Sequence, residues 1–141
     1  MNTINNDLQQ IIDYSHKFAK HMLIRSGEYF PFGAQINMQG DLASIGYEDE
    51  ESDIPNSEEV ISELSKALKD QLDVENIRAY GITSHVIIAI NQEGDKSDAI
   101  MVDIQHKDDA IPLYCFPYHW TANRDLIFGE SFVMNREYMS A

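Results

Sequence analysis

The chain has 141 residues, of which 43% are hydrophobic and 24% are charged, and its net charge is −14. A chain of this length can bury a sufficient core without disulfides or metals, so we predict a single domain over residues 1–141. A negative field repels phosphate backbones and anionic lipids, which disfavours nucleic acid as a ligand and favours a basic partner. No apolar run is long enough to span a bilayer and the first residues show no export signal, so we expect no membrane association and a cytoplasmic location.

The first part of the chain reads as a helix followed by a hairpin. Apolar residues recur with a 3.6-residue period and predict a helix from about Ile4 to Arg25. From Tyr29 the apolar period changes to two, which predicts a strand, a turn at 39–41 and a second strand over 42–47.

The second part begins with another helix. Asn56 and Glu59 have the spacing of a capping box, and the apolar stripe that follows predicts a helix from about Ser57 to Leu72. The remaining apolar segments are strand-like and are separated by turns, at 77–91, 98–106, 111–118 and 126–133. Residues 136–141 are expected to form a loose tail.

These elements define the expected fold, with the order α-β-β-α-β-β-β-β. Short connections force neighbouring strands to be antiparallel, and the second helix is the only crossover that is long enough for a parallel pair. We therefore predict an α+β two-layer sandwich, in which a mostly antiparallel sheet of five to six strands carries both helices on one face.

The densest charge in the chain is an acidic run before the second helix. It places five carboxylates in six residues, namely Glu48, Asp49, Glu50, Glu51 and Asp53. Such a run cannot be buried, so it predicts a solvated loop. The stretch from Asp41 to Glu75 holds twelve of the 24 carboxylates of the chain. This asymmetry predicts a binding surface for a basic protein partner.

Two aromatic segments lie at expected strand ends. Tyr29 and Phe30 lie beside Pro31 at the beginning of the first expected strand, and Tyr118 and Trp120 lie at and just after the end of the third of the four later segments. Such residues either fill the core or form a binding surface, since Tyr and Trp are frequent interface anchors. We include these four residues in the predicted partner-binding set.

Candidate catalytic chemistry is limited to a few side chains. Cys115 with His106 and His119 could form a nucleophile and base, and His85 could act as a base at a strand end. Spacing does not establish such a site, and a lone cysteine is usually a small buried hydrophobe. We predict no catalytic residue and no cofactor.

Metal sites are also disfavoured by the pattern of ligands. Cys115 and His119 lack the paired spacing of zinc sites. The acidic run has Ile54 where a calcium loop requires glycine and Val60 where it requires its final glutamate. We predict no metal.

One motif carries a resemblance to other proteins. The order Gly27-Glu28-Tyr29-Phe30-Pro31-Phe32-Gly33-Ala34 after a first helix resembles a widespread set of small bacterial proteins with no assigned function. Further matches are the second helix and the segments Asp98-Ala99-Ile100, His106, Pro117-Tyr118 and Phe128-Gly129-Glu130. The resemblance implies a shared fold and supplies no activity.

Three functional hypotheses follow. The first is a non-enzymatic interaction domain that binds a basic partner, in the manner of an immunity-type toxin inhibitor. The second is a small-ligand-binding protein or enzyme with a pocket between the aromatic strand ends. The third is a homodimer that pairs sheet faces or edges.

Overall fold

The computed structural model describes residues 3–45 and 57–134 and shows two helices and seven strands there. In chain order they are α1 Thr3–Ser26, β1 Phe32–Asn37, β2 Leu42–Ile45, α2 Ser57–Asp73, β3 Ile77–Ala89, β4 Lys96–His106, β5 Leu113–Trp120, β6 Leu126–Phe128 and β7 Phe132–Met134. The α+β class and the predicted element order are confirmed, with β7 as a further strand. The tail predicted at 136–141 lies outside the described residues.

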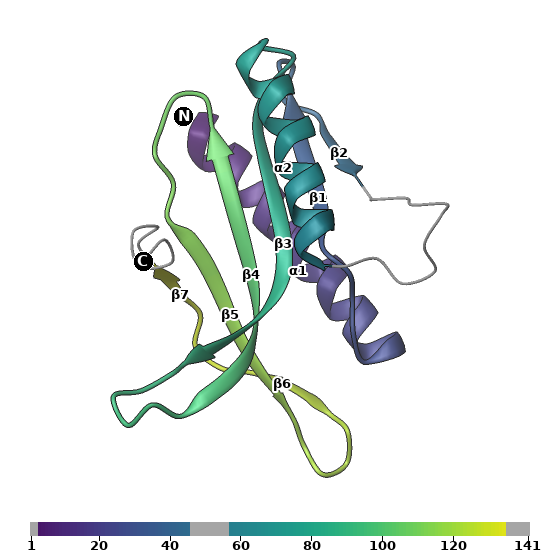
Figure 1. Ribbon diagram of the computed structural model, residues 1–141, viewed down its shortest axis with the longest axis vertical. Helices are drawn as coiled ribbons and strands as arrows, with labels where there is room; N and C mark the ends of the chain where they lie inside the picture. Colours follow the sequence, from purple (N-terminus) through teal and green to yellow (C-terminus); the bar gives the residue numbers. More distant parts are fainter. Residues whose placement is uncertain (1–2, 46–56, 135–141) are drawn as a thin grey trace.

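The strands form one antiparallel sheet (Figure 1). Its order is β2-β1-β3-β4-β5-β6, and β7 pairs with β5 on the same edge as β6. All pairings among the described strands are antiparallel. The long β3–β4 hairpin forms the centre of the sheet, and α2 lies in the connection from β2 to β3.

The two helices cover opposite faces of the sheet, with α2 in front of β1 and β3 in Figure 1 and α1 behind them. A Cβ added at Gly81 would lie 2.5 Å from Ile11 of α1, whereas a Cβ added at Gly33 would lie 3.1 Å from Leu68 of α2. Gly81 pairs with Ala34, the residue after Gly33, so neighbouring positions of β1 face different helices. This corrects the expected placement of both helices on one face of a two-layer sandwich, because an apolar stripe does not show which face it covers.

Each helix has its own core. The α1 face buries Ile11 and Leu23 of the helix against strand residues that include Phe32, Ile36, Ile100, Val102 and Ile104. The α2 face buries Val60, Leu64 and Leu68 against Ile77, Tyr80 and Ile82. Gly81 lacks a side chain where Ile11 approaches the sheet, so α1 packs directly on the backbone of β3.

The last predicted strand is divided into two short ones. The first part, β6, pairs with the end of β5, and the second part, β7, pairs with the beginning of β5. Between them the ladder is interrupted opposite Pro117. Proline has no N–H to donate to a ladder, although the Pro117 carbonyl still accepts a 2.9 Å hydrogen bond from the Gly129 N–H. The interruption therefore coincides with the residue that cannot complete the pairing.

Candidate functional site

Cys115, His106 and His119 do not meet in the structure. Cys115 is buried between Ile88 and Ala99, and its thiol lies 3.3 Å from the sulfur of Met134. Burial raises the pKa of the Cys115 thiol, which disfavours the nucleophilic thiolate. His106 occupies the opposite face of the sheet, and His119 is exposed. This geometry does not support a cysteine nucleophile with a histidine base.

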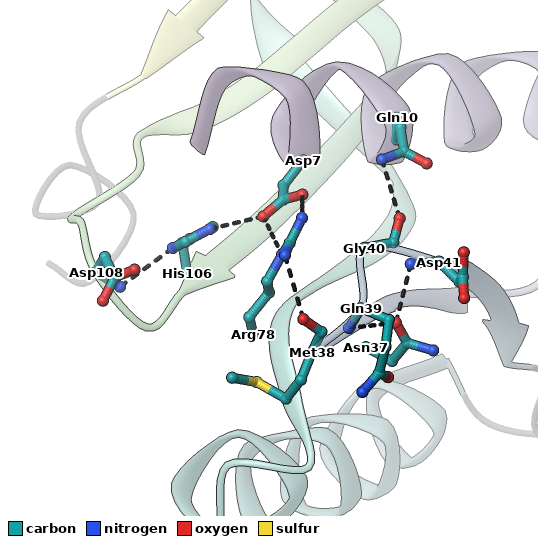
Figure 2. A network of polar contacts seen from close by, with 10 residues as sticks. All are labelled: Asp7, Gln10, Asn37, Met38, Gln39, Gly40, Asp41, Arg78, His106 and Asp108. Atoms are coloured by element: carbon teal, nitrogen blue, oxygen red, sulfur yellow. Dashed lines mark hydrogen bonds and ion pairs between the residues drawn. The ribbon is translucent and has the colours of Figure 1, made fainter. Parts of the chain in front are cut away.

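His106 instead belongs to a buried polar network, which Figure 2 shows at the N-terminal end of α1. The Asp7 carboxylate accepts two hydrogen bonds from Arg78, of 2.8 and 2.7 Å, and lies 3.0 Å from His106 Nε2. The Asp108 N–H donates to His106 Nδ1 at 3.1 Å, so the proton of a neutral His106 is on Nε2 and points at Asp7. The network ties α1 to β3 and β4.

The charge of Asp7 is stabilised inside this network. Burial alone would raise its pKa, but the hydrogen bonds and charges of Arg78 and His106 outweigh burial and lower the pKa of the Asp7 carboxyl. Arg78 also reaches the carbonyl of Met38 in the β1–β2 turn, at 3.4 Å. These polar groups are directed at one another, so we assign the network a structural role.

A cavity of about 400 Å³ lies near the C-terminal end of α1. We call it the aromatic pocket. Its walls come from α1, the segment before β1, α2, β3, β4 and β5, and its lining residues include Leu23, Glu28, Tyr29, Phe30, Ile61, Ser84, His85, Asp98, Tyr118 and Trp120. Pairing of β1 with β3 ends at Phe32 and Thr83, while β3 continues to Ala89. The pocket forms where β3 loses this neighbour.

His85 and Asp98 form an ion-pair geometry on the pocket wall. His85 Nε2 lies 2.8 Å from Asp98 Oδ1, and the two side chains are 42% and 46% exposed. His85 pairs with Ile100 across the β3–β4 ladder, so Asp98, two residues earlier, projects from the same face. Since a carboxylate only accepts hydrogen bonds, a neutral His85 donates from Nε2 and has Nδ1 available as an acceptor.

Two tyrosines supply hydroxyl groups to the pocket. The Tyr29 hydroxyl is buried and has no hydrogen-bond partner among the described residues. Burial, and next to it the Tyr118 side chain, raises the pKa of Tyr29, while burial and the charge of Asp98 raise the pKa of Tyr118 to about 12. Both hydroxyls therefore remain protonated at neutral pH and can donate a hydrogen bond to a ligand.

The structure brings together all four aromatic residues of the predicted partner-binding set. Tyr29, Phe30, Tyr118 and Trp120 line the aromatic pocket, with Tyr29 and Tyr118 buried and Phe30 and Trp120 largely accessible. The acidic members of that set, Glu48, Asp49, Glu50, Glu51 and Asp53, lie outside the described residues. Their role in binding stays a prediction.

Sequence reasoning missed other lining residues, of which Asp98 is the most informative. Its contact with His85 depends on the strand register, which local sequence motifs do not reveal. In the described residues, no group of three or more His, Cys, Asp and Glu side chains is arranged to hold a metal ion. Neither of the two described helices is both long and apolar enough to cross a membrane.

Comparison of the chain with protein-family models, curated proteins and solved structures finds no match. The resemblance based on the Gly27–Ala34 motif stays a prediction. The aromatic pocket is therefore the feature of the structure from which we infer a function.

Proposed function

We propose that the protein binds a small organic ligand in the aromatic pocket. The observation that carries this proposal is the hydroxyl of Tyr29, a residue of the pocket wall, which is buried and lacks a hydrogen-bond partner among the described residues. A buried hydroxyl without a partner costs about 1–3 kcal/mol of stability. A ligand that accepts a hydrogen bond from Tyr29 would recover part of this cost.

The position of Tyr29 distinguishes it from other buried hydroxyls. Ser15 and Thr83 also bury a hydroxyl without a partner, but neither lines one of the cavities near the end of α1. Tyr29 is therefore the one of these three residues that belongs to a cavity wall. We infer that a ligand reaches its buried hydroxyl after a small shift of the ring.

The remaining walls suit a ligand with an aromatic or apolar body. Ligand pockets are typically about 300–1,000 Å³, apolar for the most part, and contain a few convergent polar groups. The aromatic pocket has a volume of about 400 Å³ and combines aromatic walls with the His85–Asp98 pair. We infer a ligand with an acceptor for Tyr29 and a donor, or a bound water, for His85 Nδ1.

A neutral aromatic ketone, 6-propionyl-2-(dimethylamino)naphthalene, tests this proposal. Its rings match the aromatic walls and its carbonyl can accept from Tyr29. Trp120 is the only tryptophan of the chain and lines the pocket, so energy transfer from Trp120 to the probe reports that the probe is bound, and the variants below locate the site. We expect saturable probe fluorescence and simultaneous quenching of Trp120 emission.

Two alanine variants locate the binding site. Trp120→Ala should weaken the affinity for the probe, measured by titration of the probe's own fluorescence, by at least about tenfold. A fully engaged stacked aromatic contributes about 1–3 kcal/mol to ligand binding. Phe132→Ala is the matched control, since Phe132 is 36% exposed against 37% for Trp120 and lies on β7, outside the pocket. Equal effects of both substitutions, or no saturable binding to the wild type, would refute the proposal.

A second proposal concerns the acidic surface. We propose that a basic protein partner binds the acidic run, as an immunity-type inhibitor would bind a toxin, because half of the carboxylates fall between Asp41 and Glu75. This proposal assumes a cytoplasmic location and is compatible with a homodimer. Neutralising Glu48, Asp49, Glu50, Glu51 and Asp53 should abolish capture of a basic partner at low salt, and unchanged capture would contradict it.

A further inference from the structure

A second cavity adjoins the aromatic pocket and differs from it in charge. It has a volume of about 470 Å³ and shares Leu23, Gly27 and Trp120 with the aromatic pocket. Its other lining residues are Ile24, Arg25, Ser26 and Arg124. We call it the arginine cavity. Because both cavities include Trp120, one ligand can contact both.

The two arginines of this cavity have no carboxylate beside them in its lining, although the chain has 24 acidic and only ten basic residues. Neither Arg25 nor Arg124 forms an ion pair with a described residue. Two guanidinium groups therefore border one cavity without a counter-charge among the described residues.

Each arginine is held by a defined backbone structure. Arg25 is in the last turn of α1, which Gly27 ends with φ +79° and a 2.8 Å hydrogen bond from its N–H to the Leu23 carbonyl. Arg124 is in the β5–β6 turn, where its own N–H donates to the Thr121 carbonyl at 2.9 Å. The Asp125 N–H donates to the Thr121 hydroxyl at 3.0 Å. The turn and the helix end place the two side chains at the same cavity.

The lining of the arginine cavity favours an anion within that cavity, whereas Glu28 and Asp98 line the adjoining aromatic pocket. The C-terminal end of a helix carries about −0.5 elementary charge, which Arg25 complements. The positive charge of the two guanidinium groups together is larger than this partial negative charge. Carboxylates elsewhere on the surface are screened beyond about 8–10 Å at physiological salt. A guanidinium also binds carboxylate, sulfonate or phosphate oxygens through paired hydrogen bonds.

We propose that the ligand of the aromatic pocket is an aromatic organic anion. Its ring system lies in the aromatic pocket against Trp120, and its acidic group lies in the arginine cavity between Arg25 and Arg124. This inference rests on the proposed small-ligand function and adds the charge of the ligand. It assigns binding to two residues that the aromatic pocket alone does not include.

A matched pair of probes isolates the charge. The anion is 8-anilinonaphthalene-1-sulfonate, and the neutral probe is 1-anilinonaphthalene, the same ring system without the sulfonate. Both are titrated into the wild type, and quenching of Trp120 emission reports that they bind. We expect the anion to bind at least about tenfold more tightly, and its affinity, unlike that of the neutral probe, to fall as salt rises.

The double variant Arg25→Gln/Arg124→Gln tests the arginines directly. It should weaken binding of the sulfonate about tenfold and change binding of the neutral probe less than twofold. Lys66→Gln/Lys69→Gln is the matched control, because it removes the same charge from exposed positions of α2 outside both cavities. Thermal unfolding confirms that each variant is folded.

The outcomes separate the two proposals. Weaker binding of the sulfonate probe alone in the arginine variant supports the inference. Equal affinity of both probes, or a sulfonate affinity that the arginine and lysine variants change alike, would overturn the anionic ligand and leave the aromatic pocket as a neutral binding site. If neither probe quenches Trp120, the proposed function fails and the inference fails with it.

Discussion

The part of the chain that the structure describes contains two contacts between a histidine and an aspartate, and they differ in burial and in their neighbours. His106 and Asp7 are buried, and Arg78 and the Asp108 N–H complete their hydrogen bonding (Figure 2). His85 and Asp98 are almost half exposed and face a cavity. The same two residue types thus stabilise the fold at one end of α1 and line a candidate binding site at the other.

The difference teaches that pairing alone does not identify a site. In the buried network, the Asp7, Arg78 and His106 side chains already bond to one another, so a ligand would have to displace internal contacts. In the aromatic pocket, the Tyr29 hydroxyl lacks a partner and His85 keeps one ring nitrogen available. Unused hydrogen-bonding capacity beside a cavity is the better criterion for function.

The largest effect on stability should come from replacing Asp7, and the same replacement at Asp98 is the comparison. Asp7→Asn leaves Arg78 and His106 without their counter-charge and should lower the free energy of unfolding by about 3–5 kcal/mol. Asp98→Asn removes an exposed pair and should cost less than about 1 kcal/mol. Urea unfolding of both variants measures the difference, and equal costs would invalidate the distinction between the two contacts.

The histidines should repeat this contrast on a smaller scale. His106→Gln removes a buried hydrogen bond to a charged carboxylate and should cost about 1.5–3 kcal/mol. His85→Gln should cost under about 1 kcal/mol, because its partner remains solvated, and it should weaken binding of the aromatic ketone because it changes the pocket wall. Urea unfolding and ketone titration of each variant supply both numbers. A ketone affinity that only His106→Gln reduced would place the site elsewhere.

Acid should act on the buried network in a defined direction. The pKa of Asp7 is lowered by Arg78 and His106, so this carboxyl stabilises the fold fully above its unfolded pKa of about 3.9 and less as pH falls through its folded pKa. The stability difference between wild type and Asp7→Asn should therefore be constant from pH 7 to about 5 and shrink below about 4. Urea unfolding across this range checks it. A difference that grew on acidification would contradict the assigned sign.

Periodicity predicted most of the fold. Both helices begin and end within two residues of their expected positions, because their apolar stripes span several turns. The layer arrangement could not be predicted, since it depends on whether Gly33 or Gly81 faces a given helix. Periodicity also did not predict that the last strand is divided opposite Pro117 of β5, although the proline was visible in the sequence.

The site could be predicted only in part. The aromatic residues beside prolines were visible in the sequence. Tyr29 and Trp120, however, are separated by more than 90 positions, and they line one pocket only because the chain folds into the sheet order β1-β3-β4-β5. Arg25 reads locally as a cation that complements a helix end, and Arg124 as part of a turn. Their common cavity exists only in the folded chain, as does the Asp7–His106 contact.

Tyr29→Phe tests the central claim most directly, because it changes one unpaired hydroxyl. If this hydroxyl is kept for a ligand, its removal should stabilise the free protein by about 1 kcal/mol in urea unfolding, since a buried group without a partner is lost. The same variant should bind the aromatic ketone about two- to tenfold more weakly, the worth of one neutral hydrogen bond. A variant that is less stable and binds the ketone as well as the wild type would contradict the account.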